Sequence, residues 1–211
     1  MMRVKYPRTP HLPWSSGVTR DDIRQGCLSH FIGKQVIVTE KMDGENTTLY
    51  TDYMHARSID GRFHPSRAWV KALQAQIGYQ IPSGWRICGE NLYAKHAIAY
   101  HALPSYFLAF SVWNDKNECL SWQQSTRIFE QLGLCTPKTL YTGIWCEHTI
   151  KNIAVDTRIQ EGYVVRLADE FHYDEFTYAV AKWVRPNHVM TDTHWMHEEV
   201  IPNGLMEKQN G

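Results

Sequence analysis

The stretch QVIVTEKMDGENTTLYT, residues 35–51, decides the fold of this chain. Residues 35–41 form a β-branched run typical of a strand, and residues 46–51 resume the same pattern. Asp43 and Gly44 lie between them as a turn pair, so we expect a hairpin or a tight loop between two strands. Lys41 is thereby held at the end of a strand, just before a glycine-containing turn, with little bulk around it.

Working outward, we predict five further strands, at residues 54–59, 85–93, 106–113, 162–167 and 178–184, from their β-rich composition. Roughly seven strands and two clear helices favour an α+β fold with antiparallel sheets over repeated βαβ units. The chain has 211 residues and contains no internal repeat or linker-like stretch. Residues 1–211 are therefore expected to form a single domain.

The two helices have recognisable ends. The first is predicted over residues 66–78, with Ser66 as its cap and Gly78 as its end. The second begins at the capping box of Ser121 and Gln124. The proline-rich segment 6–17 is expected to be irregular and to pack through its aromatic residues.

Charge and composition exclude several classes of protein. The 22 basic and 22 acidic residues give a formal net charge of zero, which argues against a uniformly basic polyanion binder but allows a local basic groove. The five cysteines include no CxxC pair, so neither a zinc ribbon nor a disulfide framework is indicated. The N-terminus lacks an apolar signal region, and no apolar run is long enough to span a membrane. We expect a cytoplasmic protein with no membrane partner.

Lys41 is the first candidate for chemistry. A lysine amine can act as a nucleophile when neighbouring cations or a metal lower its pKa. The KxDG pattern alone is short, and an ordinary surface lysine beside a turn also fits it. An ordered set of segments follows it, namely Arg57 in HARSID, Glu90 in CGENLY, Phe110 in FLAFSVW, Glu161 in EGYVVR, and Lys182 with Arg185 in AKWVR.

In this order the segments resemble motifs I, Ia, III, IIIa, IV and V of the covalent nucleotidyltransferase superfamily. That superfamily comprises ATP-dependent RNA and DNA ligases and mRNA capping enzymes. The resemblance covers residues 36–186. It implies a nucleotidyltransferase ligase core, ATP-grasp-like, of largely antiparallel sheets with flanking helices.

The resemblance implies catalytic roles for two residues, Lys41 and Lys182, and metal binding by a third, Glu161. Lys41 would attack the α-phosphate of ATP and form a lysyl-AMP intermediate. Lys182 would neutralise that phosphate and favour the neutral form of Lys41. Glu161 would bind Mg²⁺ or Mn²⁺, directly or through water.

Other matching residues would bind the nucleotide. Glu90 would accept hydrogen bonds from the ribose hydroxyls as an ionised carboxylate. Phe110 would stack on adenine, with Phe107 as the alternative. Arg57 would contact the nucleotide phosphate or ribose, or the 5′-phosphate end of RNA.

Three further positions are of second rank. Glu40 matches a position near the adenine edge that often acts through its backbone. Asn46 matches a position near the nucleotide phosphate in RNA ligases. Arg185 would assist Lys182 or hold the acceptor strand.

Within the superfamily, an RNA ligase is favoured. The 26 residues that follow Arg185 are too few for an OB-fold barrel, so no separate OB domain is expected. The enzyme would transfer AMP to a 5′-phosphate RNA end and seal it to a 3′-hydroxyl, as in RNA repair. A DNA ligase, a capping-type nucleotidyltransferase and a nucleotide- or RNA-binding pseudo-ligase remain alternatives. A protein partner that delivers the substrate also remains open.

The C-terminal stretch HVMTDTHWMHEEV contains His188, His194, Trp195 and His197. No known zinc-site spacing is present, so we expect a capping or packing segment. Metal binding by His194 and His197 and RNA stacking by Trp195 are the alternatives.

Overall fold

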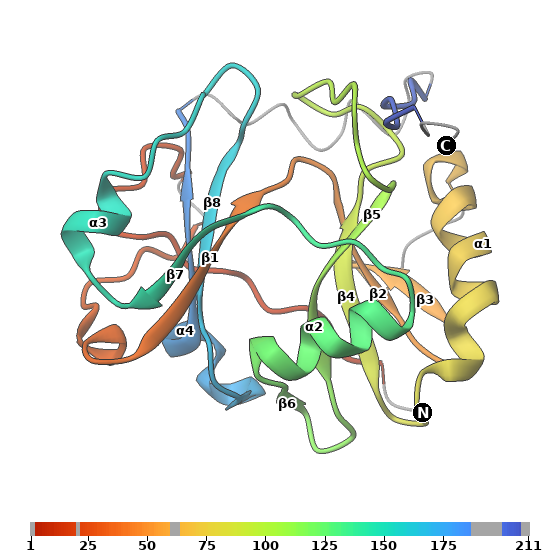
Figure 1. Ribbon diagram of the computed structural model, residues 1–211, viewed down its shortest axis with the longest axis horizontal. Helices are drawn as coiled ribbons and strands as arrows, with labels where there is room; N and C mark the ends of the chain where they lie inside the picture. The colour runs from red at the N-terminus through yellow and green to blue at the C-terminus, as the bar shows by residue number, and fades with distance from the viewer. Residues whose placement is uncertain (1–2, 20–21, 60–63, 187–199, 208–211) are drawn as a thin grey trace.

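The computed structural model describes residues 3–19, 22–59, 64–186 and 200–207. Two antiparallel sheets form its centre (Figure 1). Sheet A has the order β10-β8-β1-β7 and contains β1 (Gln35–Lys41), β7 (Thr139–Ile144), β8 (Gly162–Leu167) and β10 (Val180–Val184). Sheet B has the order β3-β2-β4-β5-β6-β9 and contains β2 (Glu45–Leu49), β3 (Met54–Ala56), β4 (Arg86–Asn91), β5 (Phe107–Trp113), β6 (Glu118–Cys119) and β9 (Phe171–His172).

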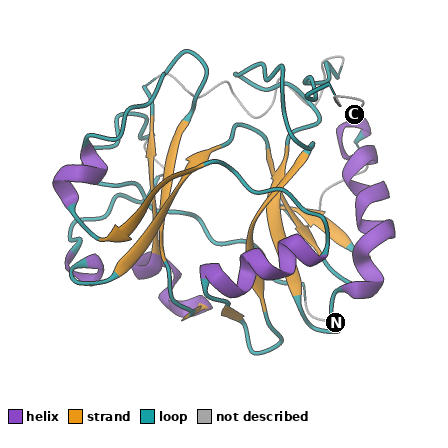
Figure 2. Ribbon diagram, in the orientation of Figure 1, coloured by secondary structure: helices purple, strands orange, loops and turns teal. Residues whose placement is uncertain are grey.

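Helices flank the two sheets (Figure 2). The two longer ones, α1 (Ala68–Ile77) and α2 (Trp122–Gln131), pack on sheet B, and α3 (Glu147–Lys151) packs beside sheet A. The short α4 (Phe176–Ala179) leads directly into β10. Four 3-10 turns complete the described elements, η1 (Ser29–Phe31), η2 (Pro65–Arg67), η3 (Gly78–Gln80) and η4 (Tyr173–Glu175). The predicted α+β class with largely antiparallel sheets is confirmed. No helix in the described ranges has the length and apolar character needed to cross a bilayer.

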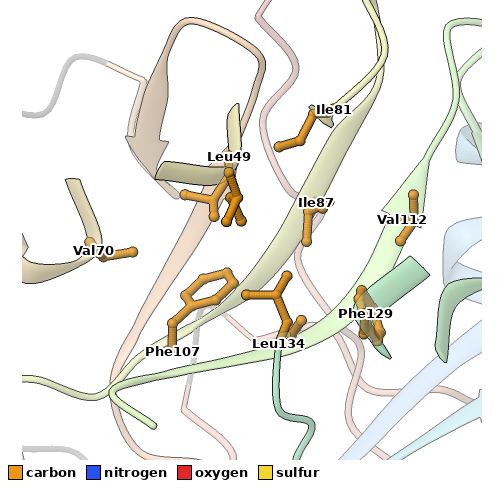
Figure 3. Close-up of a cluster of buried hydrophobic side chains, with 10 residues drawn as sticks. Leu49, Val70, Ile81, Ile87, Phe107, Val112, Phe129 and Leu134 are labelled. Atoms are coloured by element: carbon orange, nitrogen blue, oxygen red, sulfur yellow. The ribbon is translucent and has the colours of Figure 1, made fainter. Parts of the chain in front are cut away.

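Each sheet buries one of its faces in a hydrophobic core. Phe107 of β5 is fully buried between sheet B and its helices, together with Val70 of α1 and Phe129 of α2 (Figure 3). A separate core beside sheet A contains Val36 and Val38 of β1. Full burial of an apolar side chain stabilises the folded state by about 1.5–3 kcal/mol. A third cluster, which includes Trp113 of β5 and Val180 of β10, packs between the two sheets, and the site occupies the remaining space there.

The loop over residues 42–44 carries the chain from one sheet to the other. β1 pairs with β7 and β8, whereas β2 pairs with β3 and β4. The predicted hairpin is therefore wrong, and the alternative of a tight loop between strands is confirmed. A Cβ atom at Gly44 would lie 2.5 Å from the carbonyl oxygen of Asn91, so a larger residue would push the loop away from β4. Lys41 consequently stands where the chain leaves sheet A for sheet B.

The predicted helix ends are partly confirmed. The side chains of Ser121 and Gln124 form the capping box of α2. Gly78 lies at the end of α1, as predicted. The predicted cap at Ser66 is wrong, because the 3-10 turn η2 precedes α1 and the side chain of His64 caps that turn.

Several elements differ from the prediction. β6, β7, β9 and α3 were not predicted, since two of these strands have only two residues and β7 has no buried residue to mark an alternation. β10 begins at residue 180 rather than 178, because α4 takes the preceding residues. β3 ends at residue 56 rather than 59.

The proline-rich segment 6–17 is irregular, as predicted, and extends sheet A. The backbone N–H of Leu12 donates to the carbonyl of Lys182 at 2.8 Å, and the N–H of Lys182 donates to the carbonyl of Pro10 at 2.9 Å. Tyr6 packs edge-on against phenylalanine rings of β5 and α4, with ring centroids 5.4 and 5.3 Å apart. The segment thus connects both sheets at one side of the space between them.

Candidate active site

A cavity of about 690 Å³ lies between the inner faces of the two sheets. Because successive side chains of a strand point to opposite faces, residues in the middle of β8 and β10 reach this space alternately, whereas the ends of β1 and β2 that flank the connecting loop contribute adjacent residues. Sheet A contributes Thr39 and Lys41 of β1, Val164 and Arg166 of β8, and Val180 and Lys182 of β10. Sheet B contributes Glu45 and Asn46 of β2, Glu90 of β4, and Phe110, Ser111 and Trp113 of β5.

Lys41 is the last residue of β1, and its amine contacts Glu161. The Nζ atom pairs with Glu161 Oε2 and also donates to the Met42 carbonyl at 3.4 Å. Glu161 is only 6% exposed and directly precedes β8, where Gly162 lies opposite Lys41. A Cβ atom at Gly162 would lie 2.0 Å from the carbonyl oxygen of Trp183, so glycine is required for β8 and β10 to pair beside Glu161.

The charge state of Lys41 follows from these contacts. Burial lowers the pKa of the Lys41 amine, but the charges of Glu161, Glu90 and Asp43 outweigh burial, so the pKa lies above its ordinary value. The amine is therefore an ammonium at neutral pH in the ligand-free protein. Because the free amine is the nucleophilic form, reaction at Lys41 requires that the neighbouring negative charge, above all that of Glu161, be neutralised.

Glu90 faces the cavity from β4, directly opposite Asn46 of β2. Burial raises the pKa of Glu90 to about 8; Lys41 opposes this shift, and the carboxylate of Glu161 adds to it. At neutral pH the Glu90 carboxyl group is therefore mainly protonated in the ligand-free protein, whereas an ionised carboxylate is predicted from the resemblance.

The loop after β1 is fixed by segments far along the chain. The Asp43 carboxylate accepts a hydrogen bond from the backbone N–H of Ile98 at 2.7 Å, and the Asp43 N–H donates to the Tyr100 hydroxyl at 2.9 Å. The Tyr100 N–H in turn donates to Oδ1 of Asn203 at 2.9 Å. The described C-terminal segment 200–207 thus holds the loop that follows the candidate nucleophile.

Lys182 shares the inner face of sheet A with Lys41. Lys182 lies opposite Val164 in β8, and Val164 lies opposite Thr39 in β1, two residues before Lys41. Burial, reinforced by the charge of Lys41, lowers the pKa of Lys182 to about 8, and the carboxylate of Asp22 opposes this shift. The structure therefore brings both predicted lysines to one wall of the cavity.

A β-bulge decides between the two candidate phenylalanines. Ala109 and Ser111 pair with successive residues of β4, so Phe110 between them has no opposite residue. As a result both Phe110 and Ser111 face the cavity, in keeping with the way bulges redirect side chains near binding sites. Phe107 is fully buried in the core on the other side of sheet B (Figure 3). Of the two candidates, Phe110 is the one that lines the cavity.

Three other predicted residues line the cavity, namely Glu40, Asn46 and Arg57. The backbone N–H of Glu40 donates to the carbonyl of Lys138 at 2.8 Å, which fixes the backbone here. Asn46 Oδ1 is buried and accepts no hydrogen bond from any described residue. Because buried acceptors are rarely left without a donor, this atom suits contact with a ligand. Arg57 is exposed and follows β3.

Arg185 is not brought to the cavity. Its Nη1 atom donates to the carbonyl of Thr157 at 2.7 Å, and its backbone N–H donates to the carbonyl of Glu161 at 3.0 Å. These bonds fix the loop before β8, and so Arg185 contributes to the placement of Glu161. Its predicted contact with Lys182 or an acceptor strand stays a prediction.

Tyr6 and Asp22 are among the cavity residues that are not predicted from the sequence. Tyr6 packs against the Phe110 ring, and the carboxylate of Asp22 lies 4.0 Å from the Lys182 amine. Both stand in irregular segments, where no periodic pattern indicates direction. His188, His194, Trp195 and His197 lie outside the described residues, so their alternatives stay predictions.

The family model described as RNA ligase matches residues 34–184. The chain belongs to the RNA ligase family. This match confirms the family that the motif order indicates, and it contains every motif from Lys41 to Lys182. No curated protein sequence matches this RNA ligase family chain.

Solved structures share the fold of this RNA ligase family member. An archaeal ATP-dependent RNA ligase superposes with a TM-score of 0.58 at 15% identity, over 85% of this chain and 48% of that one. An RNA ligase variant from Naegleria gruberi, solved with ATP and Mn, gives 0.52 at 16% identity over 74% and 51% of the two chains. A protein from Aquifex aeolicus assigned as an ATP-dependent DNA ligase gives 0.50 at 20% identity over 74% and 45%. The chain thus spans about half the length of these structures.

Proposed function

We propose that this chain is an ATP-dependent RNA ligase in which Lys41 becomes adenylylated. The observation that carries the proposal is the position of Lys41 and Lys182 on one wall of a cavity, with Glu161 at the Lys41 amine, in a member of the RNA ligase family. A volume of about 690 Å³ also suits a nucleotide, since small-molecule sites measure roughly 300–1,000 Å³. We further propose that residues 1–211 act as one domain.

The first step forms a phosphoramidate. The Lys41 ammonium loses a proton to solvent, and the lone pair of its nitrogen attacks the α-phosphorus of ATP. As the nitrogen–phosphorus bond forms, the bond to the bridging oxygen breaks and pyrophosphate leaves with that electron pair. Loss of a second proton makes this nitrogen neutral. The product is lysyl-AMP, in which the Lys41 nitrogen is bonded to the phosphorus of AMP.

A divalent cation fits the acidic end of the cavity. No three potential ligands meet among the described residues, but Mg²⁺ commonly binds through one or two carboxylates together with substrate phosphates. We propose that Glu161 holds it. A cation bound there supplies positive charge that favours the neutral amine of Lys41. The Naegleria structures contain Mn with ATP or AMP, which supports Mg²⁺ or Mn²⁺ as the metal.

Cationic side chains hold the phosphates. With a pKa of about 8, Lys182 is mainly protonated at neutral pH and neutralises the charge that the α-phosphate carries in the transition state. Arg57, exposed at the edge of the cavity, contacts the nucleotide phosphate or ribose, or the 5′-phosphate of the RNA end.

Residues of sheet B and the end of β1 hold the nucleoside. Phe110 stacks on adenine, and stacking of a base on an aromatic ring contributes about 1–3 kcal/mol. Glu90 hydrogen-bonds the ribose hydroxyls, and a protonated carboxyl group is able to donate as well as accept. Asn46 contacts the nucleotide through its buried amide, and Glu40 lies at the adenine edge through its backbone.

The later steps join nucleic acid. AMP passes from Lys41 to the 5′-phosphate of an RNA end, which restores the lysine and activates the phosphate. The 3′-hydroxyl of the other end attacks this phosphate and AMP leaves. We propose that such sealing serves RNA repair in the cytoplasm. The partner is RNA with 5′-phosphate and 3′-hydroxyl ends, and delivery of this RNA by a second protein is the alternative to direct binding.

Intact-mass measurement tests the first step. The chain is incubated with ATP and Mg²⁺, and the expected result is a mass increase equal to one AMP, which Lys41→Ala abolishes. Lys116→Ala, at an exposed lysine outside the cavity, is the matched control and keeps the increase. A folded wild-type chain that gains no AMP would refute the proposal and favour a binding-only pseudo-ligase. Incorporation from GTP instead of ATP would favour a capping-type enzyme.

Sealing assays then test the nucleic acid. Nicked RNA duplex, single-stranded RNA and nicked DNA are compared as substrates for the adenylylated protein. We expect ligation of at least one RNA substrate with a 5′-phosphate and a 3′-hydroxyl. Turnover on DNA alone would overturn the RNA assignment and leave a DNA ligase.

A further inference from the structure

Asp22 lies in the cavity wall beside Lys182, although it belongs to none of the sequence motifs. Its Oδ1 atom is 4.0 Å from the Lys182 amine, and each of the two side chains is only 17% exposed. Both residues line the cavity. Asp22 is therefore the anionic neighbour of the residue that is proposed to hold the α-phosphate.

The carboxylate of Asp22 is fixed in place by its second oxygen. Oδ2 accepts hydrogen bonds from the backbone N–H of Thr19 at 3.0 Å and from the Thr19 hydroxyl at 2.8 Å. His11 Nε2 lies 3.4 Å from the same oxygen. Although burial acts in the opposite direction, the hydrogen bonds from Thr19 lower the pKa of Asp22, so it is ionised at neutral pH.

The same segment also binds the backbone of Lys182. His11 is fully buried, and its Nδ1 atom lies 2.8 Å from the hydroxyl of Ser15. The residues on either side of His11 exchange two backbone hydrogen bonds with Lys182, at 2.9 and 2.8 Å. The backbone of Lys182 is therefore bonded to the segment around His11, and His11 also contacts Asp22. Asp22 in turn lies beside the Lys182 ammonium.

A carboxylate at this point does not serve phosphate binding, because like charges repel. Other charges act on the Lys182 ammonium as well: Lys41 and Arg57 repel it, and Glu161 attracts it less strongly than Asp22 does. Without Asp22, the remaining attraction would come from Glu161, the carboxylate that pairs with Lys41. Asp22 gives the ammonium a position away from that pair.

We propose that Asp22 is a positioning residue that holds the Lys182 ammonium at the α-phosphate for adenylylation of Lys41. This inference rests on the proposed function. It predicts that Asp22 contributes to the rate of the chemical step and not to the affinity for ATP, since its charge opposes that of the nucleotide.

Single-turnover adenylylation over a range of ATP concentrations tests it. Asp22→Asn keeps the shape of the side chain and removes its charge. The maximal rate is expected to fall about 10- to 100-fold, the range in which misplaced catalytic groups reduce rates. The ATP dissociation constant should stay equal or decrease. Asp22→Glu restores the charge and should recover much of the rate.

Two further variants keep the test independent of folding. Thr19→Ala at an exposed position removes only one hydrogen bond to the carboxylate, and a smaller loss of maximal rate is expected. Asp174→Asn is the matched control, because Asp174 also lies 3.4 Å from a histidine, His172, but on the surface. It should leave the rate unchanged.

The outcomes separate this inference from the proposed function. If the wild-type chain forms no lysyl-AMP, the proposed function fails and the role of Asp22 fails with it. If the wild-type chain reacts and Asp22→Asn reacts equally fast, only the role of Asp22 is refuted. A rate loss caused solely by weaker ATP binding, or an Asp22→Glu variant no better than Asp22→Asn, also refutes it.

Discussion

Asn203 offers a direct test of the link between the C-terminal segment and the site. Its side chain donates to the carbonyls of Leu92 and Ala94 at 2.8 and 3.3 Å and accepts from the N–H of Tyr100 at 2.9 Å. Asn203→Ala leaves these three backbone groups without their partner. A buried polar group without a partner costs about 1–3 kcal/mol, so with partial access of water to the gap we expect a total loss of about 2–4 kcal/mol.

The loss is measurable by thermal unfolding. For a chain of this size, 1 kcal/mol shifts the melting temperature by about 2–4 °C, which predicts a decrease of roughly 5–15 °C for Asn203→Ala. Urea unfolding should give the same free-energy change with an unaltered slope. Asn152→Ala is the control, because Asn152 is exposed and donates to the carbonyl of His148 within its own helix end.

Two results would refute this reasoning, one in the free energy of unfolding and one in the rate of Lys41 adenylylation. A change below about 0.5 kcal/mol, as for ordinary surface substitutions, would show that the segment is not held by Asn203. Because Tyr100 also accepts from the N–H of Asp43, the variant should in addition slow adenylylation of Lys41 below its melting temperature. An unchanged rate would mean that the loop after β1 keeps its position without this segment.

Three further predictions concern residues of β4 and β5. The ordinary pKa of a glutamic acid is 4.5, and the pKa of Glu90 in the folded protein is about 8. Between these two pH values Glu90 is protonated only in the folded state, so the stability of the wild type falls as pH rises from 4.5 to about 8. Glu90→Gln should therefore melt higher than the wild type at pH 9 by more than at pH 5, and equal differences at both pH values would contradict this. Gly89→Ala places a Cβ atom 2.4 Å from the Phe107 ring, so the urea midpoint should fall with a loss of about 1–3 kcal/mol; an unchanged midpoint would count against the observed packing. Phe110→Ala should weaken ATP binding about tenfold in calorimetry, as expected for a lost base stack, with the melting temperature little changed. Phe107→Ala should instead lose about 3–5 kcal/mol of stability, and a reversal of the two effects would show that the bulge is misassigned.

The candidate site was largely readable because its residues stand in local patterns. The bounds of β1 and β8 follow from their β-branched runs, and the capping box of α2 from two residues three positions apart. Lys41, Glu90 and Lys182 are indicated by short segments that resemble the ligase motifs in sequence and in order. Such signals depend on neighbours in the chain, so they survive without knowledge of the fold.

Other features had no local signal. The pairing of strands is decided by residues far apart in sequence, and so alternation alone does not tell whether β1 and β2 form a hairpin or enter different sheets. Likewise the bulge that turns Phe110 inward exists only relative to β4. The raised pKa of Glu90 results from burial among charges contributed by other strands.

The sequence by itself determined the class of fold, the family and the lysine that is the candidate nucleophile. Strand periodicity is a local property of the chain, and the resemblance to the ligase motifs requires only short segments and their order. Tertiary structure alone decided that residues 42–44 bridge two sheets, that Asp22 stands beside Lys182, and that Asn203 holds the loop after β1. Each of these depends on irregular segments whose direction is set by hydrogen bonds to distant strands. No period in the sequence records such bonds, and only the folded chain brings their partners together.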